Sequence, residues 1–186
     1  MNWIIKHIDS IKSGDLDYCL SLMDFQRKKH IDGFLSERRK ALSVVAELTA
    51  KKLAAEFLNL NIEKIELLRA ENGKPYIKGN PAYISISHSG DFVAAAVSEK
   101  PIGIDIEIIK EKDLDFTKKL FCDSDLEFIN SESDSLTAFY KVWTAKEAYL
   151  KAFSKSFKEA KDTPYKALSP VHYFENGVII TIIKNC

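Results

Sequence analysis

The chain has 186 residues, of which 46% are hydrophobic, and this length predicts one compact domain or two small ones packed together. Its 27 basic residues balance its 27 acidic residues, which argues against binding nucleic acid or a membrane surface through excess positive charge. The three cysteines are an odd number without a Cys-x-x-Cys pair, which excludes a disulfide framework and a cysteine zinc site. With no apolar signal stretch and no apolar run of roughly 20 residues, the sequence predicts a soluble cytoplasmic protein.

The first part of the chain is predicted to be mainly helical. A short strand is expected at 3–8, a helix at 15–31 and a long helix at 36–58. Ser36 can cap the long helix, because a serine side chain accepts hydrogen bonds from the first free backbone amides.

After residue 60 the spacing of the hydrophobic residues changes from that of helices to that of strands. Strands are expected at 65–68, 83–87 and 92–97. Turns are expected at 71–73 and 89–91, because Asn-Gly and Ser-Gly pairs tolerate the positive φ that tight turns need.

The second part of the chain repeats this mixture after Pro101. A strand is expected at 103–109, helices at 113–130 and 135–153, and a hairpin whose strands cover 171–174 and 178–183. Each half therefore holds a long helix and a few strands joined by tight turns, which indicates an α+β fold rather than repeated βαβ units. Pro101 is the predicted joint.

The strand at 103–109 carries two carboxylates. Asp105 and Glu107 are two residues apart and share one face, while the isoleucines between them share the other. Neighbouring carboxylates repel unless they are solvated or bridged by a cation, and hard oxygen ligands suit Mg²⁺. The alternative is an ordinary half-exposed strand with its acidic face in water.

A third carboxylate, Glu147, falls within the apolar stripe of the helix at 135–153. A carboxylate in that position is costly to bury unless it is paired or bound to a metal. The alternative is a simple ion pair with Lys151, one turn later. Together with Asp105 and Glu107, Glu147 would complete a site of three oxygen ligands.

Two loops have the chemistry of a phosphate site. Lys74 lies in a turn, and His88 lies between Ser87 and Ser89 at the end of a strand. Lysine offers a point charge, and histidine and serine offer hydrogen bonds. The basic run at 38–40 opens the long helix, where cations oppose the helix dipole, so it serves a ligand or is simply solvated.

Four motifs in this order resemble those of the 4′-phosphopantetheinyl transferases. They read Gly-Lys-Pro at 73–75, Ser-His-Ser at 87–89, Ile-Gly-Ile-Asp-Ile-Glu at 102–107 and Trp-Thr-Ala-Lys-Glu-Ala-Tyr-Leu-Lys at 143–151. The resemblance covers roughly residues 20 to 153. About a hundred residues precede the Gly-Ile-Asp motif, which is similar to the monomeric type named for activating surfactin synthetase rather than to the small trimeric type.

The resemblance implies a monomeric pseudo-dimer of two similar α+β subdomains, each a long helix packed on a small antiparallel sheet. The N-terminal half, 1–100, would contact the phosphates of coenzyme A. The C-terminal half, 101–186, would carry the Mg²⁺-binding and catalytic residues.

The resemblance also implies roles for particular residues. Asp105, Glu107 and Glu147 would hold Mg²⁺, and Lys151 would neutralise the pyrophosphate. The implied contacts to coenzyme A are Lys74, Pro75, Ser87 and His88, with Arg27 and one of Arg39 or Lys40 reaching the 3′-phosphate.

The implied reaction is the transfer of phosphopantetheine from coenzyme A to a serine of an apo acyl or peptidyl carrier protein, leaving 3′,5′-adenosine bisphosphate. Such a transfer needs positioning, charge stabilisation and a base for the serine proton. The family's base is a glutamate in the helix after the Gly-Ile-Asp strand. Here Asp125 occupies the matching place, and Glu127 follows two residues later.

Three alternatives come from other functional classes. A non-catalytic module that binds coenzyme A or a nucleotide would use Lys74 and His88 but needs no set of three carboxylates. A Mg²⁺-dependent phosphohydrolase would share the metal but attack with water. A pure interaction domain would gain nothing from Glu147 within an apolar stripe.

Overall fold

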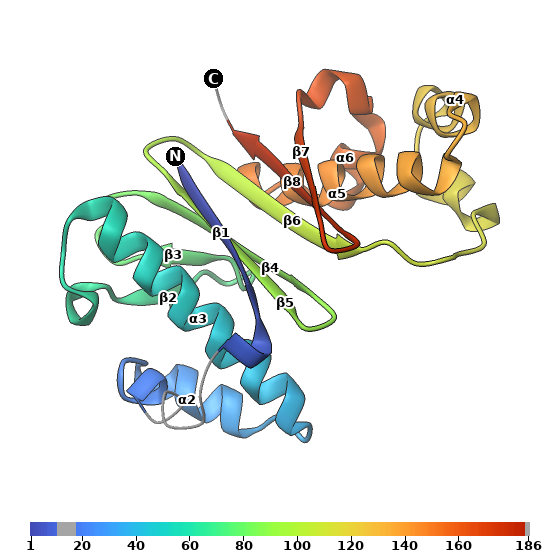
Figure 1. Ribbon diagram of the computed structural model, residues 1–186. Helices are drawn as coiled ribbons and strands as arrows, with labels where there is room; N and C mark the ends of the chain where they lie inside the picture. The colour runs from blue at the N-terminus through green and yellow to red at the C-terminus, as the bar shows by residue number, and fades with distance from the viewer. Residues whose placement is uncertain (11–17, 185–186) are drawn as a thin grey trace. The chain divides into compact units, whose positions relative to one another are not determined.

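A computed structural model of the chain describes residues 1–10 and 18–184 and divides into two compact units, Met1–Pro101 and Ile102–Cys186. Both units combine helices with small antiparallel sheets, so the fold is α+β (Figure 1). Within the described residues, the structure has no helix that is both long and apolar enough to span a membrane.

The first unit is built on a three-stranded sheet of order β1-β5-β4, in which both neighbouring pairs are antiparallel. Its strands are β1 (Asn2–His7), β4 (Tyr83–Ser89) and β5 (Phe92–Ser98). The long helix α3 (Glu37–Leu58) packs on this sheet, with alanines and leucines of its buried face meeting the isoleucines and valines of the strands (Figure 1). This packing forms the main core of the unit.

Short elements complete the first unit. Helix α2 (Phe25–Asp32) begins after Asp24, whose side chain accepts a hydrogen bond from the backbone amide of Arg27. Strands β2 (Leu67–Arg69) and β3 (Pro75–Ile77) form a separate two-stranded sheet. Two single 3₁₀ turns, η1 (Ile8–Ser10) and η2 (Ile62–Lys64), connect the larger elements.

The second unit repeats this plan with a sheet of order β6-β8-β7. Its strands are β6 (Ile102–Ile108), β7 (Val171–Glu175) and β8 (Val178–Lys184), all paired antiparallel. Helix α5 (Ser135–Phe153) packs on the sheet through alanines and aromatic residues. In both units a strand, a long helix and a hairpin follow one another, and the last strand lies in the middle of the sheet.

Smaller helices surround α5 in the second unit. They are η3 (Asp115–Lys119), α4 (Asp123–Ser131), α6 (Phe157–Asp162) and η4 (Tyr165–Leu168). Helix α6 begins with a capping box, in which Ser156 and Glu159 satisfy each other's backbone amides.

The structure confirms the two long helices, the long strands and the terminal hairpin. Two predicted helices are wrong in their extent. The helix expected at 15–31 is broken at 22–24, where Asp24 starts α2, and its residues 15–17 lie outside the described part of the chain. The helix expected at 113–130 is divided into η3 and α4, because Cys122 is extended and starts a new helix.

The pattern failed to predict five short elements, two of which are the 3₁₀ turns η1 and η2. Strand β3 and helices α6 and η4 are each three to six residues long, which is too short for a period to emerge.

A chain of hydrogen bonds crosses the interior of the second unit. The Thr144 hydroxyl donates to the Tyr140 carbonyl (2.7 Å), so it accepts from Thr181 (2.5 Å). Thr181 must then accept from Nδ1 of His172 (2.8 Å). Burial lowers the pKa of His172 to about 4, with a further contribution from Lys141, so the ring is neutral at pH 7. In the neutral ring with Nδ1 protonated, Nε2 accepts from the Tyr165 hydroxyl (2.9 Å).

We expect His172 to make the unfolding free energy depend on pH between 6.5 and about 4. In this window the unfolded chain binds a proton that the folded chain does not, so stability falls as the pH falls. The loss should be about 1–2 kcal/mol, once the partial exposure of the ring is allowed for. Urea unfolding at pH 7 and pH 4 should show that His172→Gln removes this part of the pH dependence. An unchanged pH dependence in the variant would contradict the proton assignment.

Candidate functional site

The two carboxylates of β6 lie on the face of the sheet that α5 covers. Asp105 is 4% exposed, and a Cβ atom on Gly103, which shares its face, would overlap the backbone carbonyl of Ala148 on α5. The prediction that Asp105 and Glu107 share a face is therefore confirmed. The alternative of an acidic face in water is wrong, because Asp105 is buried beneath the helix.

Glu147 of α5 is close enough to both carboxylates of β6 to feel their charge. Burial is the largest cause of the raised pKa of Glu147; Asp105 and Glu107 raise it further, while Lys151 lowers it. Glu147 therefore lies within range of the charges of both carboxylates of β6. Their mutual repulsion favours the binding of a cation among them.

Lys151 connects the helix to the strand. Its Nζ atom lies 2.6 Å from Oδ1 of Asp105, and the pair is largely buried, with 29% of the lysine and 5% of the aspartate side chain exposed. The lysine therefore supplies a positive charge inside the acidic group formed by Asp105, Glu107 and Glu147.

The donors of this acidic group are all carboxylate oxygens, the ligands that Mg²⁺ prefers, and the ion usually keeps several waters beside one or two carboxylates. Among residues 1–10 and 18–184, however, no three His, Cys, Asp or Glu side chains are arranged as a ready-made metal site. The chemistry of the residues fits Mg²⁺, and the three-carboxylate site remains a prediction.

Asp125 has surroundings that argue against the predicted base role. Its side chain is 1% exposed, one oxygen lies 2.7 Å from Nζ of Lys146, and the other accepts a hydrogen bond from the backbone amide of Tyr165 (2.7 Å). Lys146 also donates to the carbonyls of Ala160 and Thr163. The pair therefore fastens α4, the end of α6 and the segment after it to α5.

Glu127 is exposed on α4 and lines a cavity of about 490 Å³ together with Phe128 and Tyr165. None of the acidic group's side chains lines that cavity, and Glu127 is not among the charges that shift the pKa of Glu147. Nothing in the structure links Glu127 to the acidic group.

In the first unit, one of the predicted basic residues reaches a cavity. Arg27 lines a space of about 530 Å³ whose wall includes Gly73 and Tyr76, the neighbours of Lys74 and Pro75. Gly73 has φ 80°, which a side chain would strain, so this turn depends on glycine. Partial burial lowers the pKa of Lys74. This space, lined by Arg27 and Tyr76 among others, is called the arginine cavity below.

The other predicted ligand contacts lie away from the walls of the arginine cavity. Arg39 stacks on the Phe34 ring at 4.8 Å, and Lys40 pairs with Glu37 (2.8 Å). Ser87 is buried and His88 exposed on β4, because consecutive residues of a strand point to opposite faces.

Two further basic residues of the arginine cavity were not predicted. His30 and Arg69 line it as well, and Arg69 donates to the buried carboxylate of Glu47. Glu47 lies within the buried face of α3, so a charged residue within a buried face was the available signal.

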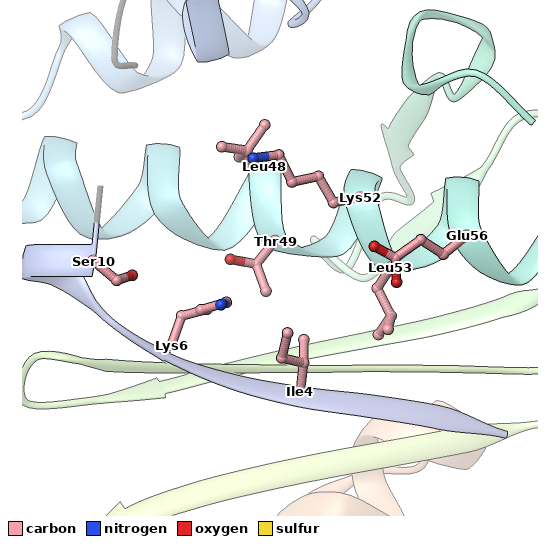
Figure 2. Close-up of a pocket in the computed structure, with 8 residues that line it drawn as sticks. All are labelled: Ile4, Lys6, Ser10, Leu48, Thr49, Lys52, Leu53 and Glu56. Carbon is pink, nitrogen blue, oxygen red and sulfur yellow. The ribbon is translucent and has the colours of Figure 1, made fainter. Parts of the chain in front are cut away.

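A smaller cavity of about 200 Å³ lies between β1 and α3 (Figure 2). Lys6 from the strand and Thr49 from the helix point into the space between these elements, and Lys52 and Glu56 also line it. None of the predicted site residues belongs to this cavity.

Two family models match consecutive parts of the chain. The model described as the 4′-phosphopantetheinyl transferase superfamily matches residues 101–173, and one described as 4′-phosphopantetheinyl transferase, N-terminal, matches residues 11–100. Together they account for most of the sequence, and they meet where the structure divides into its two units.

Curated relatives agree with these models. A 4′-phosphopantetheinyl transferase gsp of Aneurinibacillus migulanus is 34% identical over 61% of the chain, and a 4′-phosphopantetheinyl transferase of Bacillus subtilis is 26% identical over 82% of it. The mouse L-aminoadipate-semialdehyde dehydrogenase-phosphopantetheinyl transferase is 32% identical over 68% of the chain. The matched regions span 48%, 70% and 47% of these relatives, so the chain covers about half the length of two of them.

Proposed function

Because the chain belongs to the 4′-phosphopantetheinyl transferase superfamily, we propose that it transfers the 4′-phosphopantetheine group of coenzyme A to a serine of an apo carrier protein. The second product would be 3′,5′-adenosine bisphosphate. The observation that supports the proposal most strongly is the acidic group, in which Glu147 lies within range of the charges of Asp105 and Glu107, and Lys151 pairs with Asp105. A phosphoryl transfer needs such a concentration of charge more than it needs a covalent catalyst.

We also propose that the two units form a pseudo-dimer within one chain and that the enzyme is monomeric and cytoplasmic. Its support is the repeated plan of the two units, in which strand, long helix and hairpin recur with the same strand order. The N-terminal unit would provide the contacts to coenzyme A, and the C-terminal unit would provide the acidic group.

Asp105, Glu107 and Glu147 would hold Mg²⁺. The ion would supply positive charge that neutralises the pyrophosphate oxygens of coenzyme A. Lys151 already carries a positive charge beside Asp105 and would contribute it to the same pyrophosphate. Lys146 precedes Glu147 on α5, pairs with Asp125 and donates to the carbonyls of Ala160 and Thr163. These contacts hold α5, and with it Glu147, in place.

The serine proton needs an acceptor close to the acidic group. Asp125 is buried and paired, and Glu127 is exposed elsewhere. Glu147 belongs to the group and lies within range of both Asp105 and Glu107, so it is the carboxylate best placed to accept the proton. We therefore assign the acceptor role to Glu147.

For coenzyme A, we propose contacts from Lys74, Pro75, Ser87 and His88, with Arg27 at the 3′-phosphate. The arginine cavity supports this, because its lining passes through the turn that carries Lys74 and includes the Arg27 guanidinium.

The test is the intact mass of an apo carrier protein after incubation with the enzyme, coenzyme A and Mg²⁺. A gain of one phosphopantetheine is expected, together with 3′,5′-adenosine bisphosphate. Binding of coenzyme A without a change in carrier mass would indicate a non-catalytic binding module. Hydrolysis of coenzyme A at its pyrophosphate without transfer would indicate a phosphohydrolase.

We expect Lys74→Ala to weaken coenzyme A binding by roughly 10-fold, because a charge-assisted contact is lost from a partly buried position. Affinity for the carrier protein should stay the same. Calorimetry with each partner checks this, and Lys78→Ala, at an exposed lysine four residues later, is the matched control. Unchanged coenzyme A affinity in Lys74→Ala would rule out direct contact.

We expect Glu127→Gln to keep transfer activity within about threefold of wild type, because nothing links this side chain to the acidic group. Loss of a positioned base would instead cost roughly 10²–10⁴-fold in rate. Steady-state transfer rates distinguish the two. A loss of that size would return the base role to Glu127.

A further inference from the structure

A row of three polar residues crosses the sheet of the second unit beneath α5. Asp105 on β6 lies opposite Thr181 on β8, and Thr181 lies opposite His172 on β7. Residues directly opposite each other on neighbouring strands point to the same face of a sheet. This is the face that α5 covers, because the fully buried Thr181 hydroxyl bonds to Thr144 of that helix.

The hydrogen bonds of this row run in one direction. They pass from Tyr165 to His172, from His172 to Thr181 and from Thr181 to Thr144, which donates in turn to the Tyr140 carbonyl. A hydroxyl has a single proton to donate. Because His172 donates to Thr181, the proton of Thr181 is directed toward α5.

Two side-chain contacts join α5 to this row, one on either side of Glu147 in the sequence. Thr144, three residues before Glu147, bonds to Thr181. Lys151, four residues after Glu147, lies 2.6 Å from Oδ1 of Asp105. The part of α5 that carries Glu147 is therefore held at both ends against two adjacent residues of the row.

Apolar packing alone does not fix the position of this part of α5. The buried cluster beneath it includes Ala145, Ala148 and Ala152, whose small side chains let the helix come close to the sheet. Hydrophobic contact has no direction, so it does not set where the helix stops along the strands. A hydrogen bond does, because it weakens steeply when its distance and angle change.

We propose that Thr181 is a positioning residue of the metal site. Its hydrogen bond to Thr144 fixes α5 over β6 and β8, and this sets the place of Glu147 relative to Asp105. The proposal rests on the proposed function, in which these two carboxylates hold Mg²⁺. Removing a group that orients metal ligands from behind typically costs roughly 10–100-fold in metal affinity.

The experiment measures the Mn²⁺ affinity of Thr181→Val, which keeps the shape of the side chain and loses the hydroxyl. Mn²⁺ is titrated into the full chain saturated with coenzyme A, and free Mn²⁺ is measured by its electron paramagnetic resonance signal. The variant should fold, because Thr144 still donates to the Tyr140 carbonyl and a neutral His172 can carry its proton on Nε2 instead.

Two further variants separate positioning from a general loss of stability. Thr181→Ser keeps the hydroxyl and should restore the affinity. Thr117→Val is the matched control, because Thr117 is another buried threonine of the same unit, and its hydroxyl donates to the Leu114 carbonyl (2.7 Å).

We expect Thr181→Val to weaken Mn²⁺ binding by roughly 10-fold or more, and Thr181→Ser and Thr117→Val to stay within about threefold of wild type. Wild-type affinity in Thr181→Val overturns the proposal but not the function, and so does an equal loss in Thr181→Ser or Thr117→Val. A wild type that binds coenzyme A but no Mn²⁺ contradicts the metal site of the proposed function itself, and the proposal with it. If Thr181→Val does not fold, Thr144→Val decides by the same measurement, because it removes the same hydrogen bond from the side of the helix.

Discussion

Glu147→Gln should reduce carrier-protein modification to below roughly a thousandth of the wild-type rate while the fold remains intact. The amide has nearly the shape of the carboxylate, but it can neither accept a proton nor balance a cation. Rates measured by intact mass of the carrier, alongside far-ultraviolet circular dichroism, check both halves of the prediction. The control is Glu111→Gln, at an exposed glutamate of the same unit, which should keep full activity.

The same substitution should also change stability in a pH-dependent way. The pKa of Glu147 is raised above 4.5, so its negative charge destabilises the metal-free fold at pH 7. Glu147→Gln should therefore melt at a higher temperature than wild type at pH 7. The difference should vanish below about pH 4, where the glutamate is protonated in the folded and unfolded states alike. A variant that melts lower at pH 7 would contradict the repulsion among the three acids.

Gly103→Ala should lower the unfolding free energy by at least about 3 kcal/mol, because the added methyl group has no space. It would overlap the carbonyl oxygen of Ala148 and lie 2.7 Å from the backbone nitrogen of Ala152. Backbone atoms of a packed helix cannot move aside as a flexible side chain can. Strand β6 and helix α5 would have to separate, and with them Asp105 and Lys151.

Urea unfolding checks this prediction, with Gly33→Ala as the matched control. Gly33 has φ −70°, and a Cβ added there would lie 3.4 Å from the nearest atom, the backbone carbonyl oxygen of His30. An alanine therefore fits at this position. The control should be neutral or slightly stabilising, by up to about 1 kcal/mol. If Gly103→Ala stayed within about 1 kcal/mol of wild type, the close approach of β6 to α5 would be refuted.

Local periodicity was enough to predict the elements that carry the acidic group. The two-residue spacing of Asp105 and Glu107 placed both on one face, and the helical spacing around Glu147 predicted that it would be withdrawn from solvent, as it is in part. Both spacings can be read within a few residues of sequence. The apolar residues around them fix which face of β6 and of α5 is buried.

Contacts between distant residues could not be predicted in this way. Lys146 on α5 pairs with Asp125 on α4, which lies 21 positions earlier in the sequence. The residues around Lys146 give no sign of which carboxylate it pairs with. Without that contact, Asp125 resembled the family's base, whereas in the folded chain it is buried and paired with Lys146, which argues against that role.

The basic residues show the same limit. The role of Arg27 was implied by the family resemblance, but Arg69 is isolated in sequence and was missed. The two meet only because α2 and β2 both pack beside Glu47 on α3. A glutamate within the buried face of a long helix was the one sequence signal that a buried cation lay near it.

The most direct test of the acidic group is the position of a bound metal in crystals grown with coenzyme A and Mn²⁺ in place of Mg²⁺, located by its anomalous scattering. The account predicts one ion whose ligands include carboxylate oxygens of Asp105, Glu107 and Glu147, at about the 2.0–2.1 Å typical of Mg²⁺ or slightly longer. An ion bound only to phosphate oxygens, or to carboxylates elsewhere in the chain, would contradict it.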